Sequence, residues 1–132
     1  YPGIKPELVK SLSKYDGVVF AGTGLGHVPS NPFGDKLATP IIKEIAGLIL
    51  SGVHVAVAPQ TINGRINLNV YTAGRMLKEA GVMGHLCDWL PETAFVKLSW
   101  VLGQTKDAKK VEKMMYTNYA GEIGERSLPE HF

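Results

Sequence analysis

The residues best placed to do chemistry begin in the glycine-rich stretch AGTGLGHVPS, residues 21–30. Its glycines, at positions 22, 24 and 26, allow positive φ angles and let the backbone approach another group closely, because they carry no Cβ. The glycines alone predict a tight turn. Thr23 and His27 add a hydroxyl and a titratable ring, and these favour a ligand-contacting loop.

The spacing of this loop does not fit a nucleotide cradle. A dinucleotide fingerprint needs G-x-G-x-x-G running directly into a helix, so that the helix N-terminus faces the phosphates. Here the third required glycine is replaced by His27, and a proline-containing loop follows instead of a helix. The sequence also contains no G-x-x-x-x-G-K-[ST] segment, so we expect the loop to serve a different ligand.

A second polar stretch, residues 59–69, is richer in hydrogen-bonding side chains than a simple connection needs. Asn63-Gly64 is typical of a turn, and other polar residues near it could cap helix ends. The polar side chains of this stretch and its continuation are Gln60, Thr61, Asn63, Arg65, Asn67, Asn69 and Tyr71.

Other arrangements of reactive residues are weakly supported. His85 and Cys87 are two candidate metal ligands, whereas a closed zinc site needs four. A Ser/His/Asp or Cys/His triad stays open on composition, but no nucleophile elbow supports one. The residues alone therefore predict a ligand-binding domain without an evident catalytic set.

The elements that must position these loops alternate between helix and strand. Strands apolar on both faces are typical of a parallel sheet covered by helices. We expect an α/β fold with a small open parallel sheet and helices on both faces. The strands are expected at 17–21 and 53–58, with a minimal one at 82–83. The helices are expected at 5–13, 36–50 (broken near Pro40), 70–80 and 92–102, the last with Pro91 at its start and Gly103 after its end. A final helix, capped by Asp107, is expected to run to about 117.

Two further expectations follow from this arrangement. Ligands bind beyond the carboxyl ends of parallel strands, so the loops at 22–32 and 59–69 should be neighbours at one sheet edge. The helix at 92–102 carries apolar residues over most of its circumference, including Trp100, and is expected to be buried.

Composition limits the class of protein. The 132 residues suffice for one domain. A net charge of +2 does not indicate direct binding to nucleic acid or to an anionic membrane. A single cysteine fits a reducing compartment, and the apolar runs fall short of the ~20 residues of a membrane span, so we expect a cytoplasmic protein. The chain opens on a turn without an initiator Met, which predicts a fragment, and 121–132 predicts a loose or docking tail.

Four segments in order resemble the C-terminal domain of type I asparaginase-like proteins: YPGIKPELV, DGVVFAGTGLGHVP, INGRINLNVYTAGRMLKEAGV and LPETAFVKLSWVLGQT. The closing stretch MMYTNYAGEIGER, together with GRINLNVYTAGR and LPETAFVKL, resembles one branch of that family, the D subunits of archaeal glutamyl-tRNA(Gln) amidotransferases. The resemblance implies a Rossmann- or flavodoxin-like domain spanning residues 1–132.

The resemblance also implies an activity. Members of this branch release ammonia from glutamine and pass it to a partner, the E subunit, which uses ATP and Mg to convert Glu-tRNA(Gln) to Gln-tRNA(Gln). The family's catalytic threonines lie in TGGTI-like and HGTDT-like motifs of an N-terminal domain, and both motifs are missing here. We therefore expect no catalytic residue, no metal and no bound cofactor in this chain, and inactivity on its own. Expected partners are a second copy in a homodimer or higher oligomer, the E subunit, and tRNA(Gln) through the complex, with no membrane.

The site residues follow from the same resemblance. In the family this glycine loop reaches toward the active site of a neighbouring subunit, which implies substrate contacts by Thr23, Gly24, Gly26 and His27. His27 falls where some members have an asparagine, and Tyr71 falls near a second cross-subunit position. Two alternatives stay open: the C-terminal domain of a type I L-asparaginase, and a non-enzymatic binding or oligomerisation module.

Overall fold

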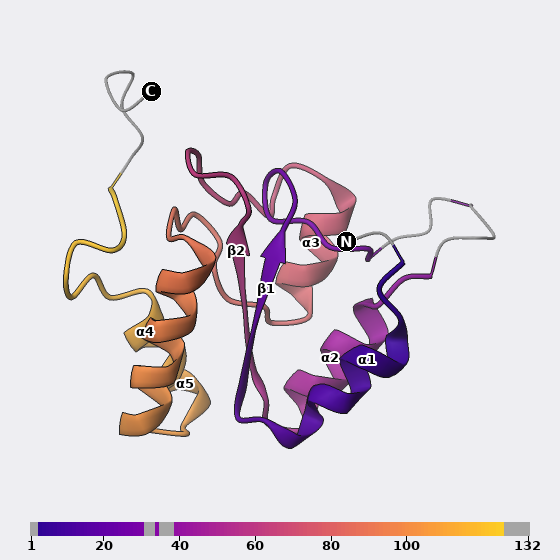
Figure 1. Ribbon diagram of the computed structural model, residues 1–132, viewed down its shortest axis with the longest axis horizontal. Helices are drawn as coiled ribbons and strands as arrows, with labels where there is room; N and C mark the ends of the chain where they lie inside the picture. Colours follow the sequence, from indigo (N-terminus) through magenta and orange to yellow (C-terminus); the bar gives the residue numbers. More distant parts are fainter. Residues whose placement is uncertain (1–2, 31–33, 35–38, 126–132) are drawn as a thin grey trace.

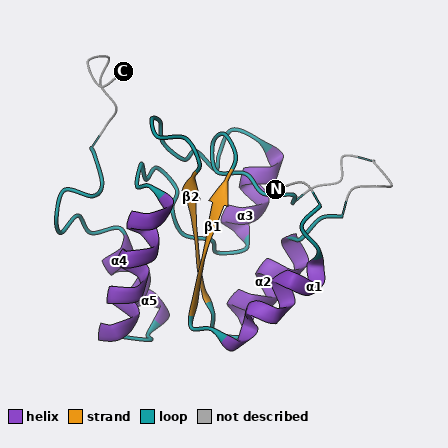
Figure 2. Cartoon of the chain, viewed as in Figure 1, coloured by secondary structure: helices purple, strands orange, loops and turns teal. Residues whose placement is uncertain are grey.

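Two parallel strands form the centre of the protein, seen in a computed structural model that describes residues 3–30, 34 and 39–125 (Figures 1 and 2). Strand β1 spans Gly17–Gly22 and strand β2 spans His54–Pro59, paired from Gly17↔His54 to Gly22↔Pro59. Both are rich in valine and small apolar residues, which suit a pleated surface covered on both sides. The two predicted strands and their parallel pairing are confirmed.

A single-residue bridge extends the sheet on the other side of β2. Met83 forms a parallel bridge with Ala56. The Met83 N–H donates to Val55 O, and the Met83 carbonyl accepts from the Val57 N–H, each at 2.9 Å. The strand predicted at 82–83 is therefore present only as a single-residue bridge at Met83. Because β2 lies between two neighbours, its residues from Val55 to Pro59 are buried, whereas β1 is mostly half-buried.

One face of the sheet is covered by the first three helical elements (Figure 1). These are α1 (Pro6–Lys10), continued by the 3₁₀ turn η1 (Ser11–Lys14), then α2 (Ile42–Leu50) and α3 (Thr72–Glu79). Pro6 begins α1, where its missing N–H costs nothing. The core on this side is formed by Val9, Ile41, Ile45, Leu48, Val53, Val55, Val57, Ile66, Leu68, Leu77 and Val82.

The opposite face is covered by α4 (Pro91–Gln104) and α5 (Ala108–Met115). Asp107 caps α5 as expected, since its Oδ1 accepts the Lys110 N–H at 2.9 Å. The core here is formed by Ala56, Ala58, Met83, Cys87, Trp89, Ala94, Leu98, Val101, Val111 and Met115. Helices on both faces confirm the predicted α/β class.

Two helix starts differ from the prediction. The helix expected from residue 36 begins at Ile42; residues 36–38 lie outside the described part, and 39–41 are not helical. Pro40 disfavours helical backbone before it, and Ile41 donates its N–H to Pro29 O at 2.7 Å. Similarly, α3 begins at Thr72 because Tyr71 is extended, with φ −113° and ψ 153°.

The prediction that the helix at 92–102 is buried on most sides is wrong. Only one face of α4 packs against the sheet and α5, so Ala94, Leu98 and Val101 are buried. Trp100 is 47% exposed because it points away from the sheet. The other large hydrophobic side chains left exposed on α4 are Phe95 and Val96. The helix also continues through Gly103, which was expected to end it. In the described residues, no helix combines the length and apolarity that a membrane crossing requires.

Candidate substrate-contacting loops

The glycine loop closes on itself immediately after β1. Thr23 and His27 exchange two backbone hydrogen bonds, Thr23 N to His27 O at 2.9 Å and His27 N to Thr23 O at 2.8 Å. A Cβ at Gly22 would lie 2.7 Å from the Gly26 carbonyl carbon, so the turn needs glycine there. Gly24 and Gly26 both have positive φ, 51° and 97°. The predicted tight turn is confirmed.

The second loop lies directly against the first, as expected for loops leaving neighbouring parallel strands (Figure 1). Asn67 donates its N–H to Leu25 O at 3.1 Å, and Gln60 donates its N–H to Gly22 O at 2.9 Å. A Cβ at Gly26 would lie 2.9 Å from Ile66 Cγ2, so Gly26 lets the two loops touch. The prediction that both loops share one sheet edge is confirmed.

His27 and Tyr71, which lie 44 positions apart in sequence, are brought together at this edge. Their rings meet edge to face, with centroids 5.3 Å apart and planes at 77°. Burial lowers the pKa of His27, so the imidazole is neutral at neutral pH. Its Nε2 is buried without a hydrogen-bond partner among the described residues, whereas Tyr71 is 57% exposed. A buried ring nitrogen of this kind has hydrogen-bonding capacity to offer a ligand.

Thr23 lies in the same loop but is not arranged as a nucleophile. Its hydroxyl donates to the His27 carbonyl at 3.4 Å rather than to a basic side chain. A threonine hydroxyl needs an adjacent base to attack a carbonyl carbon. Thr23 can therefore contribute a contact, and the loop as a whole can bind a small polar group.

His85 and Cys87 do not converge on a common point. The His85 ring lies between Leu68 N, 3.2 Å from Nδ1, and Asn69 Nδ2, 3.1 Å from Nε2. Burial and the nearby Lys78 charge lower the pKa of His85, which suits an unprotonated Nδ1 that accepts the Leu68 N–H. Cys87 is 1% exposed, and its thiol is 3.9 Å from the His85 carbonyl. Both residues support the fold of the second loop.

A cluster of polar residues that the sequence did not predict ties the second loop to the C-terminal segment. Arg65 donates to Leu86 O at 2.6 Å and Gly124 O at 3.0 Å, and pairs with Asp88 at 3.1 Å. Asp88 in turn accepts the Gly124 N–H at 2.9 Å. The one sequence signal was an acidic residue inside the otherwise apolar stretch LCDWL.

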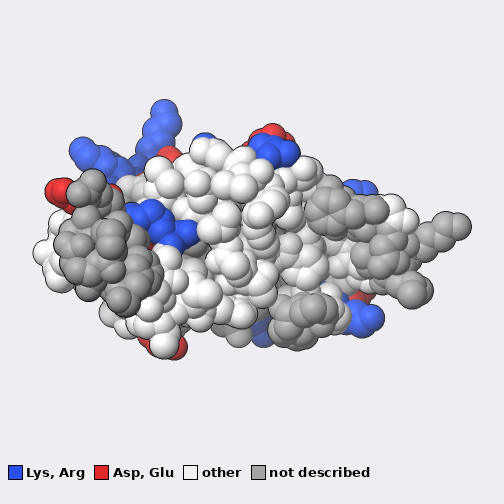
Figure 3. Space-filling view, turned by 90° about the horizontal axis from the view of Figure 1, so that it is seen from above, with Lys and Arg blue, Asp and Glu red and all other residues white. Residues whose placement is uncertain are grey.

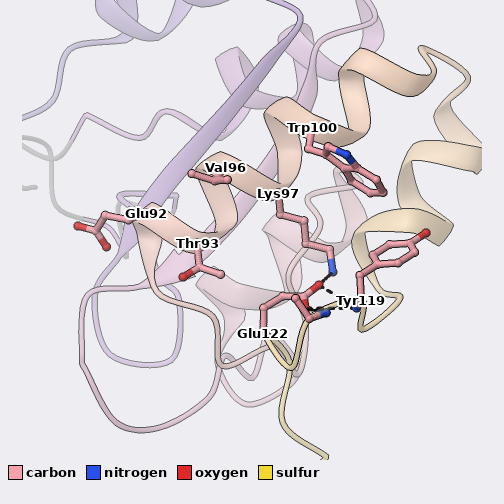
Figure 4. Close-up of a pocket in the computed structure, with 8 residues that line it drawn as sticks. Glu92, Thr93, Val96, Lys97, Trp100, Tyr119 and Glu122 are labelled. Atoms are coloured by element: carbon pink, nitrogen blue, oxygen red, sulfur yellow. Dashed lines mark hydrogen bonds and ion pairs between the residues drawn. The ribbon is translucent and has the colours of Figure 1, made fainter.

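A separate hollow of about 520 Å³ lies along α4 (Figure 4). Lys97, which is 6% exposed, pairs with Glu122 inside it and donates to Thr117 O at 2.5 Å. Trp100 and Tyr119 meet edge to face with centroids 5.1 Å apart. The lining residues are Glu92, Thr93, Val96, Lys97, Trp100, Tyr119, Ala120 and Glu122. None belongs to either loop, so this hollow is distinct from the predicted site.

The face that carries the loops is mostly uncharged at its middle. Seen from above, Lys and Arg side chains gather toward one end and the rims (Figure 3). Such a surface suits a small neutral or zwitterionic ligand, or a neighbouring protein surface, better than a polyanion.

The architecture defines a class: an open α/β domain with a parallel sheet covered by helices on both faces and two adjoining loops at one edge of the sheet. Residues 1–115 match the model of the glutaminase/asparaginase C-terminal domain, so the chain belongs to that family.

The chain is similar to known proteins of two kinds. It is 47% identical over its whole length to the D subunit of glutamyl-tRNA(Gln) amidotransferase from Pyrococcus furiosus, and 48% identical to that from Methanothermobacter thermautotrophicus, covering 28% of each. It also superposes on the thermostable L-asparaginase of Thermococcus kodakarensis with a TM-score of 0.82 at 31% identity, covering 96% of this chain and 36% of that one. The chain therefore spans little more than a quarter of the amidotransferase subunits it matches.

Proposed function

We propose that this chain is the C-terminal domain of the glutamine-hydrolysing subunit of a tRNA-dependent amidotransferase. In the whole enzyme the side-chain amide C–N bond of glutamine breaks, water supplies the hydroxyl of the glutamate product, and ammonia is released. The ammonia is consumed in converting Glu-tRNA(Gln) to Gln-tRNA(Gln). The observation that carries this proposal is the identity to the D-subunit sequences, 47% over the whole chain, against 31% to the solved asparaginase.

The two loops have a definite role in this proposal. The Nε2 of His27 and the hydroxyl of Tyr71 supply hydrogen bonds for a small amide substrate held partly by a neighbouring subunit. The buried Nε2, which has no hydrogen-bond partner in the part of the chain that the structure describes, supports this role, because buried polar atoms in folded proteins are normally hydrogen-bonded. Thr23, Gly24 and Gly26 shape the loop and let the backbone approach the substrate.

The proposal extends to the assembly. The working unit is a homodimer or higher oligomer, joined by an E subunit that supplies the ATP and Mg chemistry and receives the ammonia. The complex binds tRNA(Gln) in the cytoplasm. The uncharged middle of the loop face supports a contact with protein rather than with nucleic acid on this side.

Glutamine hydrolysis and amide transfer test this function directly. The full-length product of the gene, produced with its E subunit, should release ammonia from glutamine and form Gln-tRNA(Gln) with ATP and Mg. Residues 1–132 alone should release no more ammonia than a blank without enzyme. Hydrolysis of asparagine in preference to glutamine, with no copurifying E subunit, would favour the free asparaginase that the structural likeness also allows.

Loop variants of the full-length protein test the role of the site. His27→Ala and Tyr71→Ala should each lower kcat/KM for glutamine by roughly 10- to 100-fold, as expected for one or two lost hydrogen bonds. Tyr15→Ala, which removes a similarly exposed tyrosine before β1, is the matched control and should keep wild-type kinetics. Wild-type efficiency in both loop variants would contradict the substrate contacts and favour a domain that only binds or oligomerises.

A further inference from the structure

The C-terminal segment is linked to the glycine loop through the Arg65–Asp88 pair. The guanidinium of Arg65 bonds three groups from two other segments: Leu86 O, Gly124 O and the Asp88 carboxylate. The side chains of Arg65 and Asp88 are 18% and 26% exposed, so the pair is shielded from solvent. A planar guanidinium can hold several acceptors at once in a fixed geometry, which a lysine cannot do.

The partners of Arg65 are themselves held in place. Leu86 has φ 64°, a left-handed conformation that costs free energy for a branched residue. Its carbonyl accepts from Arg65, and its N–H donates to Ile66 O at 3.0 Å. Gly124 approaches so closely that an added Cβ would lie 2.6 Å from Asp88 Oδ2. Arg65 therefore bonds both the strained backbone at Leu86 and the closely packed backbone at Gly124.

Ile66, the residue after Arg65, connects Arg65 to the glycine loop. Ile66 donates its N–H to Cys87 O at 2.9 Å, and its side chain packs where Gly26 has no Cβ. Asn67 then donates its N–H to Leu25 O at 3.1 Å. A continuous series of contacts therefore runs from Gly124 through Arg65 and Ile66 to the loop that holds His27.

We propose that Arg65, with Asp88, is a positioning residue that fixes the glycine loop for substrate binding and ties it to the C-terminal segment at Gly124. Arg65 acts through Ile66 and Asn67 and does not touch the substrate. The substrate part of this inference rests on the function proposed above. The positioning part is a property of this chain alone.

Amide hydrogen exchange on the folded chain tests the positioning. In Arg65→Met, the amides of Gly26, His27 and Asn67 should exchange about 10-fold faster, because the loop they close opens more often. The His54 amide, which bonds Asp16 O at 3.0 Å at the other end of the strands, should be unchanged. Lys106→Met is the matched control, because it removes an exposed ion pair in which Lys106 Nζ lies 2.7 Å from Asp16 Oδ2. Unaltered exchange at the three loop amides, or an equal rise at His54, would overturn the proposal.

Kinetics of the full-length protein test the consequence for substrate. Arg65→Met should raise KM for glutamine by about 10-fold with kcat within about 2-fold, and Arg65→Lys should recover part of the loss. Faster loop exchange with an unchanged KM would overturn the substrate part of the proposal. If the wild-type protein hydrolyses no glutamine, the proposed function fails, and the exchange experiment still decides the positioning role. Should Arg65→Met not fold, Arg65→Lys and Asp88→Asn decide it by the same measurements, each with a smaller rise.

Discussion

The two tryptophans of this chain occupy contrasting environments, although both lie in or beside α4. Trp89 is 2% exposed and donates its indole N–H to Val57 O at 3.1 Å, whereas Trp100 is 47% exposed and packs on Tyr119. The sequence could not separate them, because both stand among apolar residues. Trp89 lies before α4 and packs against β2, whereas Trp100 lies on the face of α4 that points away from the sheet.

Alanine substitutions should expose this difference. Trp89→Ala should lower the free energy of unfolding by roughly 3–5 kcal/mol through the cavity it leaves and the unpaired Val57 carbonyl. Trp100→Ala should cost about 1 kcal/mol, as for a half-exposed contact. Urea unfolding of the two variants measures both values, and equal losses would contradict the assignment.

The carboxylate of Glu122 makes the stability of the fold depend on pH. Desolvation alone raises its pKa, but hydrogen bonds from Lys97 and from the backbone N–H groups of Ala120 and Tyr119 outweigh it and lower the pKa to about 2. A carboxylate whose pKa is lower in the folded state stabilises the fold above its unfolded value and loses that contribution as pH falls toward the folded value.

The expected pH window is therefore about 4.5 down to about 2. Wild type should be more stable than Glu122→Gln near pH 6, and the difference in Tm should shrink steadily through this window. Melting curves of both proteins between pH 2 and 6 check it. A constant difference at every pH would mean that the Glu122 charge contributes nothing.

At the scale of elements, two glycines of one loop have different reasons to be glycine. Gly24 has φ 51°, and a Cβ added there would meet no other atom within 4 Å. Gly26 has φ 97°, and a Cβ added there would lie 2.9 Å from Ile66 Cγ2. The sequence shows only that both glycines belong to one turn. The contact with Ile66 depends on where the second loop lies.

Gly24→Ala should cost roughly 1–2 kcal/mol, the penalty of a left-handed backbone with a Cβ. Gly26→Ala should cost roughly 2–5 kcal/mol, because overpacking against Ile66 adds to that penalty. Chemical denaturation of the two variants gives the comparison. A smaller loss in Gly26→Ala than in Gly24→Ala would show that the loops are not packed as described.

Local patterns predicted many elements well. The apolar runs at 18–20 and 55–58, Pro91 at a helix start and the Asp107 cap each carry their information within a few residues. The start of α2 was missed because it depends on a bond between Ile41 and Pro29, formed only in the folded chain.

Site geometry could be predicted only in outline. The rule that ligands bind at the carboxyl ends of parallel strands placed both loops at one edge. It could not predict that His27 would meet Tyr71, because that contact depends on how the chain enters α3. Arg65, Asp88 and Gly124 come from three separate segments, and no local pattern links them.

At the scale of the whole molecule, the reactivity of the buried Cys87 thiol reports how often the core opens to solvent. Burial raises the pKa of Cys87 to about 12, so the thiol stays protonated at pH 8 in the folded state. A thiol reagent in excess should therefore modify the chain only when the core between the sheet and α4 opens. Because the chain has one cysteine, the labelling rate measured by mass spectrometry reports a single event. Labelling as fast as in urea-unfolded chain would mean that this core is open to solvent, whereas slow labelling that accelerates with urea would measure how often the two layers part.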